Sequence, residues 1–203
     1  MVCRLSHLLT PRRNGFALIP ALAAVAVLAA PAASASAASP LTGETLAGTA
    51  TTTNGGGRAI PSCINHGLAG ASATFNASGE ATGPYPGSFV ENQGSASLSE
   101  TVMHNQLSAD SISVPFTITT GATTITGTIS HSQFSRYPNL NGFGFLCAGA
   151  TVVGLSVNTT ATYTATIQAP GQTPQAISGQ AQVFGSLYTQ PGAQTSLTAS
   201  FTG

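Results

Sequence analysis

Apolar and polar residues alternate along most of the chain from residue 71 onward. The alternation is clearest over 111–119, where every second side chain is large and apolar and most of those between carry hydroxyls. The apolar positions are Ile112, Val114, Phe116 and Ile118, and the hydroxyl positions are Ser111, Ser113, Thr117 and Thr119. A period of two predicts a half-buried β-strand. We therefore expect the apolar set to enter the core while Ser111, Ser113 and Thr117 face water.

The same alternation recurs in several further stretches. It returns over 122–130 after Thr120-Gly121, which predicts a hairpin between 111–119 and 122–130. It also marks 153–157, 163–167, 181–187 and 197–201, with Asn158-Thr159 expected as a turn between the first two. Further strands are expected over 45–52, 71–77, part of 79–92 and 95–103. The total is about nine or ten strands, and we expect an all-β antiparallel sandwich or barrel.

The segments between these strands are expected to be irregular. Residues 38–44 suggest a flexible lead-in to a single β domain over 45–203. A long loop is expected over 54–70, because it begins with Asn54 and three glycines. A second irregular stretch is expected over 136–142, within a loop of 135–147.

The first 37 residues have the features of a secretory signal peptide. Arginines precede an apolar stretch over 16–30, and small residues around Ala35 and Ala37 suit a signal peptidase. The apolar stretch is about 15 residues, short of the roughly 20 that span a bilayer. Arg12-Arg13 resembles a twin-arginine signal, but Gly15 departs from that motif and favours general secretion. We expect a secreted, extracellular protein that is not inserted in a membrane once the leader is removed.

Composition narrows the classes of partner. After the leader, two arginines face five acidic residues and no lysine is present, which gives a formal charge of −3. So few cations predict no binding to nucleic acid or to an anionic membrane surface. The absence of lysine beside abundant Ala, Gly, Thr and Ser indicates a GC-rich bacterial genome. A glycan or protein of the cell envelope is the expected class of partner, and no cofactor is expected.

Two cysteines, Cys63 and Cys147, follow the leader. The exported compartment is oxidising, so we expect an intramolecular disulfide between them. It would close a loop of roughly 85 residues and remove about 4.5 kcal/mol of chain entropy from the unfolded state. A metal site is not expected, because the chain has no Cys-x-x-Cys and no histidine pair at ligand spacing.

The clearest local motif is Gly-Pro-Tyr-Pro-Gly-Ser-Phe over 83–89. Two prolines and flanking glycines predict a rigid corner between strands, and a Tyr85 side chain presented for binding is the alternative. This segment, from Ala77 to Phe89, resembles a motif of uncharacterised secreted proteins of actinomycete bacteria. The resemblance implies an all-β exported domain and assigns no functional residue.

No catalytic motif is found after the leader. A nucleophile elbow, a zinc-protease motif and a phosphate-binding loop are all absent from the sequence. We therefore expect a non-catalytic secreted or envelope-associated module with a structural or binding role. The alternatives are a glycan-binding or inhibitor-like protein-binding module, and an enzyme whose site has no known signature. Rows of Ser and Thr on the strand faces suit solubility, or else a hydroxyl-rich binding face.

If the domain binds a partner, its long loops are the expected place. The predicted disulfide would join the 54–70 and 135–147 loops, which hold Arg58, His66, Arg136 and Tyr137. We therefore predict a mildly basic binding pole from these four residues. A structure that placed Arg58 and Arg136 at opposite ends of the domain would contradict it.

Overall fold

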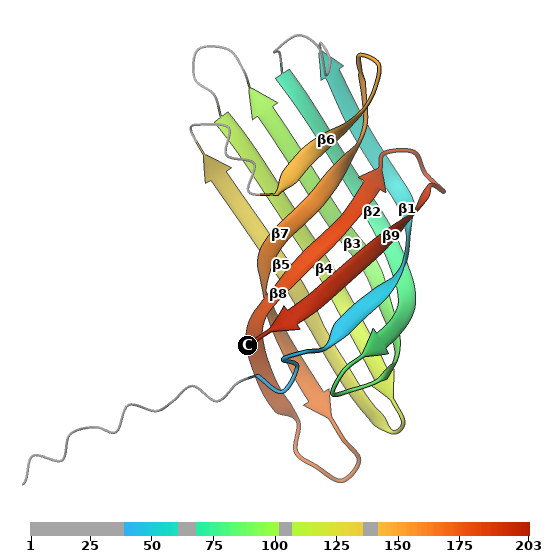
Figure 1. Ribbon diagram of the computed structural model, residues 1–203, viewed down its shortest axis with the longest axis vertical. Helices are drawn as coiled ribbons and strands as arrows, with labels where there is room; N and C mark the ends of the chain where they lie inside the picture. Colours follow the sequence, from blue (N-terminus) through green and yellow to red (C-terminus); the bar gives the residue numbers. More distant parts are fainter. Residues whose placement is uncertain (1–38, 61–67, 102–106, 136–141) are drawn as a thin grey trace, which may run out of the picture. The chain divides into compact units, whose positions relative to one another are not determined.

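The structure is a computed structural model that describes residues 39–60, 68–101, 107–135 and 142–203. These residues form nine β-strands (Figure 1). The strands are β1 (Thr45–Ile60), β2 (Leu68–Thr82), β3 (Gly87–Thr101), β4 (Leu107–Thr120), β5 (Thr123–Ser135), β6 (Phe143–Ala148), β7 (Thr151–Gln168), β8 (Gln175–Tyr188) and β9 (Gln194–Thr202). The expected all-β, antiparallel class is confirmed.

All nine strands belong to one antiparallel sheet in the order β5-β4-β3-β2-β1-β9-β8-β7-β6. An additional pairing of β5 with β7 closes the sheet into a ring of eight strands. Of the two expected architectures, the structure is therefore the barrel and not the sandwich. Figure 1 shows β7, β8 and β9 crossing in front of β2–β5. We call the end of the ring that holds Thr45 and the 83–86 turn the lower end, and the end that holds Ile60 the upper end.

The ring is closed along its lower part, but above that part it is open along two seams. β5 pairs with β7 only from Thr124 to Ser130, and above this point β6 pairs with the same edge of β7. On the other side, β1 pairs with β9 only from Thr45 to Thr51. Above these levels, the described parts of β1 and β5 each keep one strand neighbour.

The core lies inside the ring. Ile112, Val114, Phe116 and Ile118 are buried, as the alternation predicted, whereas Ser111, Ser113 and Thr117 lie on the outer face. Phe116 and Tyr163 both make edge-to-face contacts with the ring of Phe201, with centroids 5.4 and 4.8 Å away. Such aromatic pairs add specific stabilisation to the burial of apolar surface. The core is therefore shared between β4, β7 and β9, which lie far apart in the sequence.

Bulges in β1 and β3 change which residues face inward. The register of β3 against β4 shifts between Glu91 and Ser95, so Glu91 and Ala96 both point into the ring. Gln93 has a φ of 59°, and its backbone N–H donates to Asn76 Oδ1 at 2.9 Å. Gly94 lies against the ring of Phe75, where a Cβ atom would approach to 2.6 Å. The bulge therefore needs glycine at this position.

The lower end of the ring is closed by the residues that precede β1. Residues 39–44 were expected to be a flexible lead-in, but they form a hydrogen-bonded turn in which Leu41 is fully buried. The Ser39 hydroxyl is hydrogen-bonded to the Tyr163 hydroxyl inside the ring. This turn is tied to β9 as well, because Gly43 N–H donates to the Phe201 carbonyl.

The hairpin prediction and the corner prediction are both confirmed. The register pairs Thr120 with Thr123 and continues without a shift as far as Ser108 and Ser135. The 83–86 turn joins β2 to β3, and Tyr85 packs against the core, with its backbone N–H donating to Glu44 Oε2 at 2.7 Å. A tyrosine held in this way has an architectural role at the corner.

Three predicted boundaries are wrong. Asn158-Thr159 is no turn, since β7 runs without interruption from Thr151 to Gln168. The 54–70 loop is shorter than expected, because Asn54–Ile60 continue β1 in register with β2. The 135–147 loop contains β6. In the first two cases long-range strand pairing holds polar or glycine-rich residues in extended geometry, which local sequence alone does not favour.

Candidate functional site

Most residues of the predicted basic pole lie outside the described part of the chain. His66, Arg136 and Tyr137 are among them, and the backbone of Arg58 lies in β1 opposite Gly70. Ile60 and Ser135, the strand ends that precede the two segments concerned, are both at the upper end of the ring. The pole stays a prediction.

The predicted disulfide and the predicted leader also involve residues outside the described part of the chain. Cys147 lies exposed in β6, next to the tight turn that leads into β7, whereas Cys63 lies outside the described residues. Residues 1–37, the expected leader, also lie outside them. Both stay predictions.

The described surface offers a different candidate, two parallel rows of small polar residues on the outer face of β1–β5. The register places the residues of each row side by side on adjacent strands. The upper row is Gly56, Ser72, Ser97, Ser111 and Ser132. The lower row is Asn54, Thr74, Ser95, Ser113 and Ser130. We call these two rows the hydroxyl rows.

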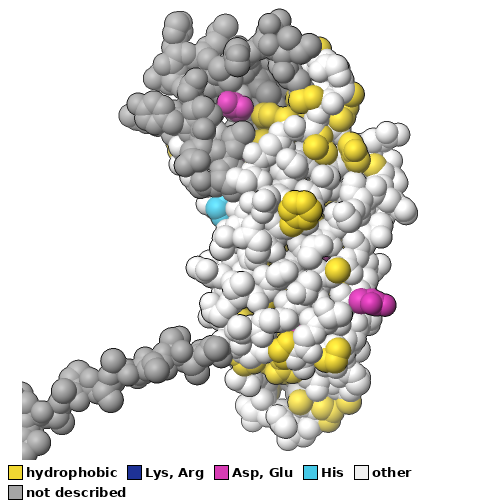
Figure 2. Space-filling model, viewed as in Figure 1, with side chains coloured by type: hydrophobic (Ala, Val, Ile, Leu, Met, Phe, Trp, Pro, Cys, Tyr) yellow, Lys and Arg dark blue, Asp and Glu magenta, His cyan; other side chains and the backbone are white. Residues whose placement is uncertain are grey.

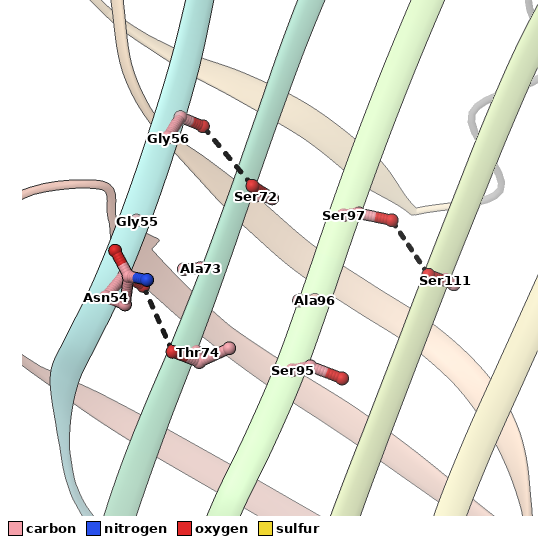
Figure 3. Close-up of a pocket in the computed structure, with 10 residues that line it drawn as sticks. All are labelled: Asn54, Gly55, Gly56, Ser72, Ala73, Thr74, Ser95, Ala96, Ser97 and Ser111. Atoms are coloured by element: carbon pink, nitrogen blue, oxygen red, sulfur yellow. Dashed lines mark hydrogen bonds between the residues drawn. The ribbon is translucent and has the colours of Figure 1, made fainter.

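Hydrogen bonds between neighbouring strands fix several of these hydroxyls (Figure 3). The Ser97 and Ser111 hydroxyls are 2.8 Å apart and bond to each other. Thr74 Oγ1 donates to the Asn54 carbonyl at 3.3 Å, and Ser72 Oγ lies 3.5 Å from the Gly56 carbonyl. Each bond runs across the strands, along the direction of the rows. The rows therefore present oriented donors and acceptors to solvent.

The hydroxyl rows are hollowed relative to their margins. A depression of about 400 Å³ lies over β1–β4, and it is lined by seven residues of the two rows, as far as Ser111 on β4, together with Gly55, Ala73 and Ala96. A second depression of about 520 Å³ begins at Ser111 and Ser113 and reaches Thr160 and Thr162 on β7. Ser111 lines both, so the two depressions adjoin, and together they extend across the strands. We call the two depressions together the hydroxyl groove.

His131 lies in the second depression, at the point where β5 leaves β7. Its Nε2 is 3.0 Å from Oδ1 of Asp110, and its ring stacks on Phe143 at a centroid distance of 6.0 Å. The Asp110 side chain is buried, which raises the pKa of its carboxyl, and the adjacent His131 ring opposes part of that rise. The His131 side chain is 19% exposed and is one of the residues that line the second depression.

The contact between Asp110 and His131 was not predicted from the sequence. The hairpin register supplies it, since Ile112 pairs with His131 and Asp110 with Gln133. Extending the predicted 111–119 and 122–130 hairpin by two residue pairs would have found this pair.

Charge is nearly absent from the hydroxyl groove. The described lining of its two depressions has no Lys, Arg, Asp or Glu, but the buried Asp110 contacts His131 and lines an adjoining depression that shares Ser97, Ser111 and Ser132. Two other buried acids, Glu44 and Glu91, face the interior of the ring and not the groove. The described residues also contain no group of three or more metal-ligating side chains. The described lining of the groove therefore consists mainly of uncharged hydrogen-bonding groups.

Comparison with known proteins finds no family model, no curated protein and no solved structure that matches the chain. Within the described residues, no helix is long and apolar enough to cross a membrane. Any assignment of function therefore rests on the geometry of the surface itself.

Proposed function

We propose that the protein is a secreted, non-catalytic module that binds a neutral, linear glycan along the hydroxyl groove. The observation that carries this proposal is the pair of hydroxyl rows in register across β1–β5. Secretion is proposed from the leader-like residues 1–37.

The direction of the rows supports a polymer as the ligand. Adjacent strands lie about 4.8 Å apart, so each row offers a polar group at that interval across the sheet. This interval is close to the length of one pyranose unit in a linear β-linked chain. A glycan that crosses the strands would therefore meet a hydroxyl, amide or backbone carbonyl at each sugar.

The chemistry of the groove supports an uncharged ligand. Serine and threonine hydroxyls both donate and accept hydrogen bonds, as sugar hydroxyls do. No described acidic or basic side chain, apart from His131, offers a charge to a phosphate, sulfate or ammonium group in the groove. A protein partner fits less well, because stable protein interfaces have an apolar or aromatic centre that the hydroxyl rows lack.

Binding to soluble oligosaccharides tests the proposal directly. Cellohexaose and the hexasaccharide of chitin are suitable probes, measured by isothermal titration calorimetry with the purified chain. Replacing both Ser97 and Ser111 with Met would fill the floor of the groove and remove its central hydroxyl pair. We expect this double variant to lose at least tenfold in affinity.

The control is a hydroxyl pair outside the groove. Thr49 and Ser78 are exposed partners on β1 and β2, below the hydroxyl rows. Their replacement with Met should leave affinity within about twofold of the wild type, and thermal unfolding should show that both variants are folded. No binding of either probe by the wild type would overturn the proposal, as would equal losses in the two double variants.

A further inference from the structure

Phe184 is a large aromatic side chain that the fold leaves exposed on β8. Its inward-facing neighbours Val183 and Gly185 are buried, whereas 59% of Phe184 is accessible to solvent. Figure 2 shows the face on which β8 lies, where hydrophobic side chains are scattered among uncharged polar ones. An exposed ring set among polar groups is a common feature of surfaces that bind amphipathic ligands.

Hydrogen-bonded amides lie beside this ring and are held in one arrangement. Gln182 Nε2 donates to Asn158 Oδ1 at 2.7 Å, and Thr160 Oγ1 donates to Gln182 Oε1 at 2.8 Å. Asn158 is the β7 partner of Phe184, and Thr160 is the β7 partner of Gln182. The ring therefore has fixed polar groups next to it on two strands.

The same polar groups connect Phe184 to the hydroxyl groove. Thr160 lines the second depression of the groove together with Ser132 and His131. Gln182 continues that level onto β8, and Phe184 lies two residues farther along the same outer face, about 7 Å away. A chain that leaves the second depression over β7 and turns with the ring would therefore reach Phe184 on β8.

We propose that Phe184 is the stacking platform of a terminal subsite, where the face of a pyranose ring packs on the phenyl ring while its hydroxyls bond to Gln182 and Asn158. This inference rests on the proposed glycan binding and specifies where the groove ends. From Ser111 on β4 to Phe184 on β8 there are three interstrand steps and two residues along β8, roughly 16 Å along the outer surface of the ring. A disaccharide is too short to occupy both places, whereas a hexasaccharide spans them.

The affinity test separates aromatic stacking from apolar contact. Phe184→Leu keeps an apolar side chain and removes the ring, whereas Phe184→Tyr keeps the ring. We expect F184L to lose five- to tenfold in affinity for cellohexaose and little for cellobiose, and F184Y to stay within twofold of the wild type. Tyr188→Leu is the matched control, because Tyr188 is an exposed aromatic on the same face of β8, four residues farther along and off the path.

A fluorescence test reports on the subsite without depending on affinity. The chain contains no tryptophan, so Phe184→Trp introduces a single tryptophan, which can be excited selectively at the platform. Its emission should change and saturate as cellohexaose is added, whereas Tyr188→Trp should not respond. The F184L and fluorescence results together decide whether a sugar contacts this ring.

The outcomes for groove and platform are distinguishable. Loss of binding in the Ser97/Ser111 double variant with unchanged F184L and silent F184W would overturn the subsite and leave the groove in place. Loss in F184L with an unaffected groove variant would overturn the groove, and with it the path proposed to Phe184. Failure of the wild type to bind either hexasaccharide would overturn both.

Discussion

β5 has strand neighbours on both sides along its lower half, from Thr124 to Ser130, and on one side along its upper half. The inward residues of the lower half include Ile125 and Ile129, both fully buried. Those of the upper half are the polar residues His131, Gln133 and Ser135, all partly exposed. The change from apolar to polar inward residues therefore marks the level at which the ring opens.

β1 shows the same change at its own seam. Leu46 and Ala50 are buried where β1 lies between β2 and β9. Beyond Thr51, where pairing with β9 stops, the sequence becomes Asn-Gly-Gly-Gly over 54–57. Within β1, the amino-acid composition therefore depends on how many strands flank each segment as well as on which face of the sheet a residue occupies. This explains why a glycine-rich segment was mistaken for a loop.

The largest expected effect tests the closed lower part of the ring. Phe116→Ala should lower the free energy of unfolding by about 3–5 kcal/mol, because it empties a buried site and removes the contact with Phe201. Thr117→Ala on the outer face of the same strand is the matched control and should change it by less than about 0.5 kcal/mol. Chemical denaturation measures both, and a cost below about 1 kcal/mol for F116A would contradict the register.

Glu91 gives the next effect, because it is a buried acid in the closed part of the ring. Its Oε2 has no hydrogen-bond partner among the described residues, and burial raises the pKa of its carboxyl to about 8. The folded state thus keeps a proton that the unfolded state releases near pH 4.5. The stability from this proton is complete below that pH and is lost as the pH rises through about 8.

Glu91→Gln should remove this pH dependence. Between about pH 6 and pH 9 we expect the wild type to lose about 2–3 kcal/mol more than E91Q in its free energy of unfolding. Urea denaturation at several pH values measures the difference, and the other titrating groups cancel in the comparison. Parallel curves for the two proteins would show that Glu91 ionises freely in the folded state.

At the open seam between β5 and β7, the buried acid Asp110 has a hydrogen-bond partner in His131. Removing this partner should lower the free energy of unfolding by less than the changes at Phe116 and Glu91. His131→Ala leaves Asp110 without the ring that contacts its Oδ1, and we expect a loss of about 1–2 kcal/mol. Adding Asp110→Asn to this variant should restore part of the loss, because an amide is cheaper to bury than a carboxylate. A double variant less stable than H131A would show that Asp110 has a further essential contact.

The smallest effect is expected at Phe134, on the upper half of β5. Its side chain is 69% exposed, so Phe134→Ser should change the free energy of unfolding by less than about 0.5 kcal/mol. Phe116 and Phe134 lie on neighbouring strands, and this pair of substitutions contrasts the two halves of the ring most directly. A cost above about 1 kcal/mol for F134S would show that this ring is covered in solution.

Sequence reasoning found the strands whose alternation is strong. The inward set on β4, the β4–β5 hairpin and the corner at Tyr85 all follow from local pattern and turn chemistry. It failed at Asn158-Thr159, because the turn preference of these residues is overridden by pairing with β8 on one side. Ring closure by β5 and β7 was also out of reach, since no local pattern encodes which distant strands meet.

The hydroxyl groove was predictable only in part. Outward serines and threonines were expected, but their alignment into rows depends on the register of four successive strand pairs. The bulges at Thr52–Asn54 and Glu91–Ser95 shift that register, and nothing in the sequence signals their position with enough precision. Phe184 was missed for a related reason, since it occupies an outer position among polar residues that the alternation assigns to solvent.

The pairing of β1 with β9 has a consequence for how the chain folds. These are the first and last strands of the ring, and their partners are separated by about the whole length of the domain, as Thr45 and Ser200 illustrate. Contacts of such long sequence separation slow folding, because loop entropy is lost before the contact forms. A chain that is delivered N-terminus first therefore cannot close its ring until β9 has emerged. Until then the edge of β1 that pairs with β9 has no strand neighbour. A truncation that removes β9 should therefore yield a chain that aggregates through this edge.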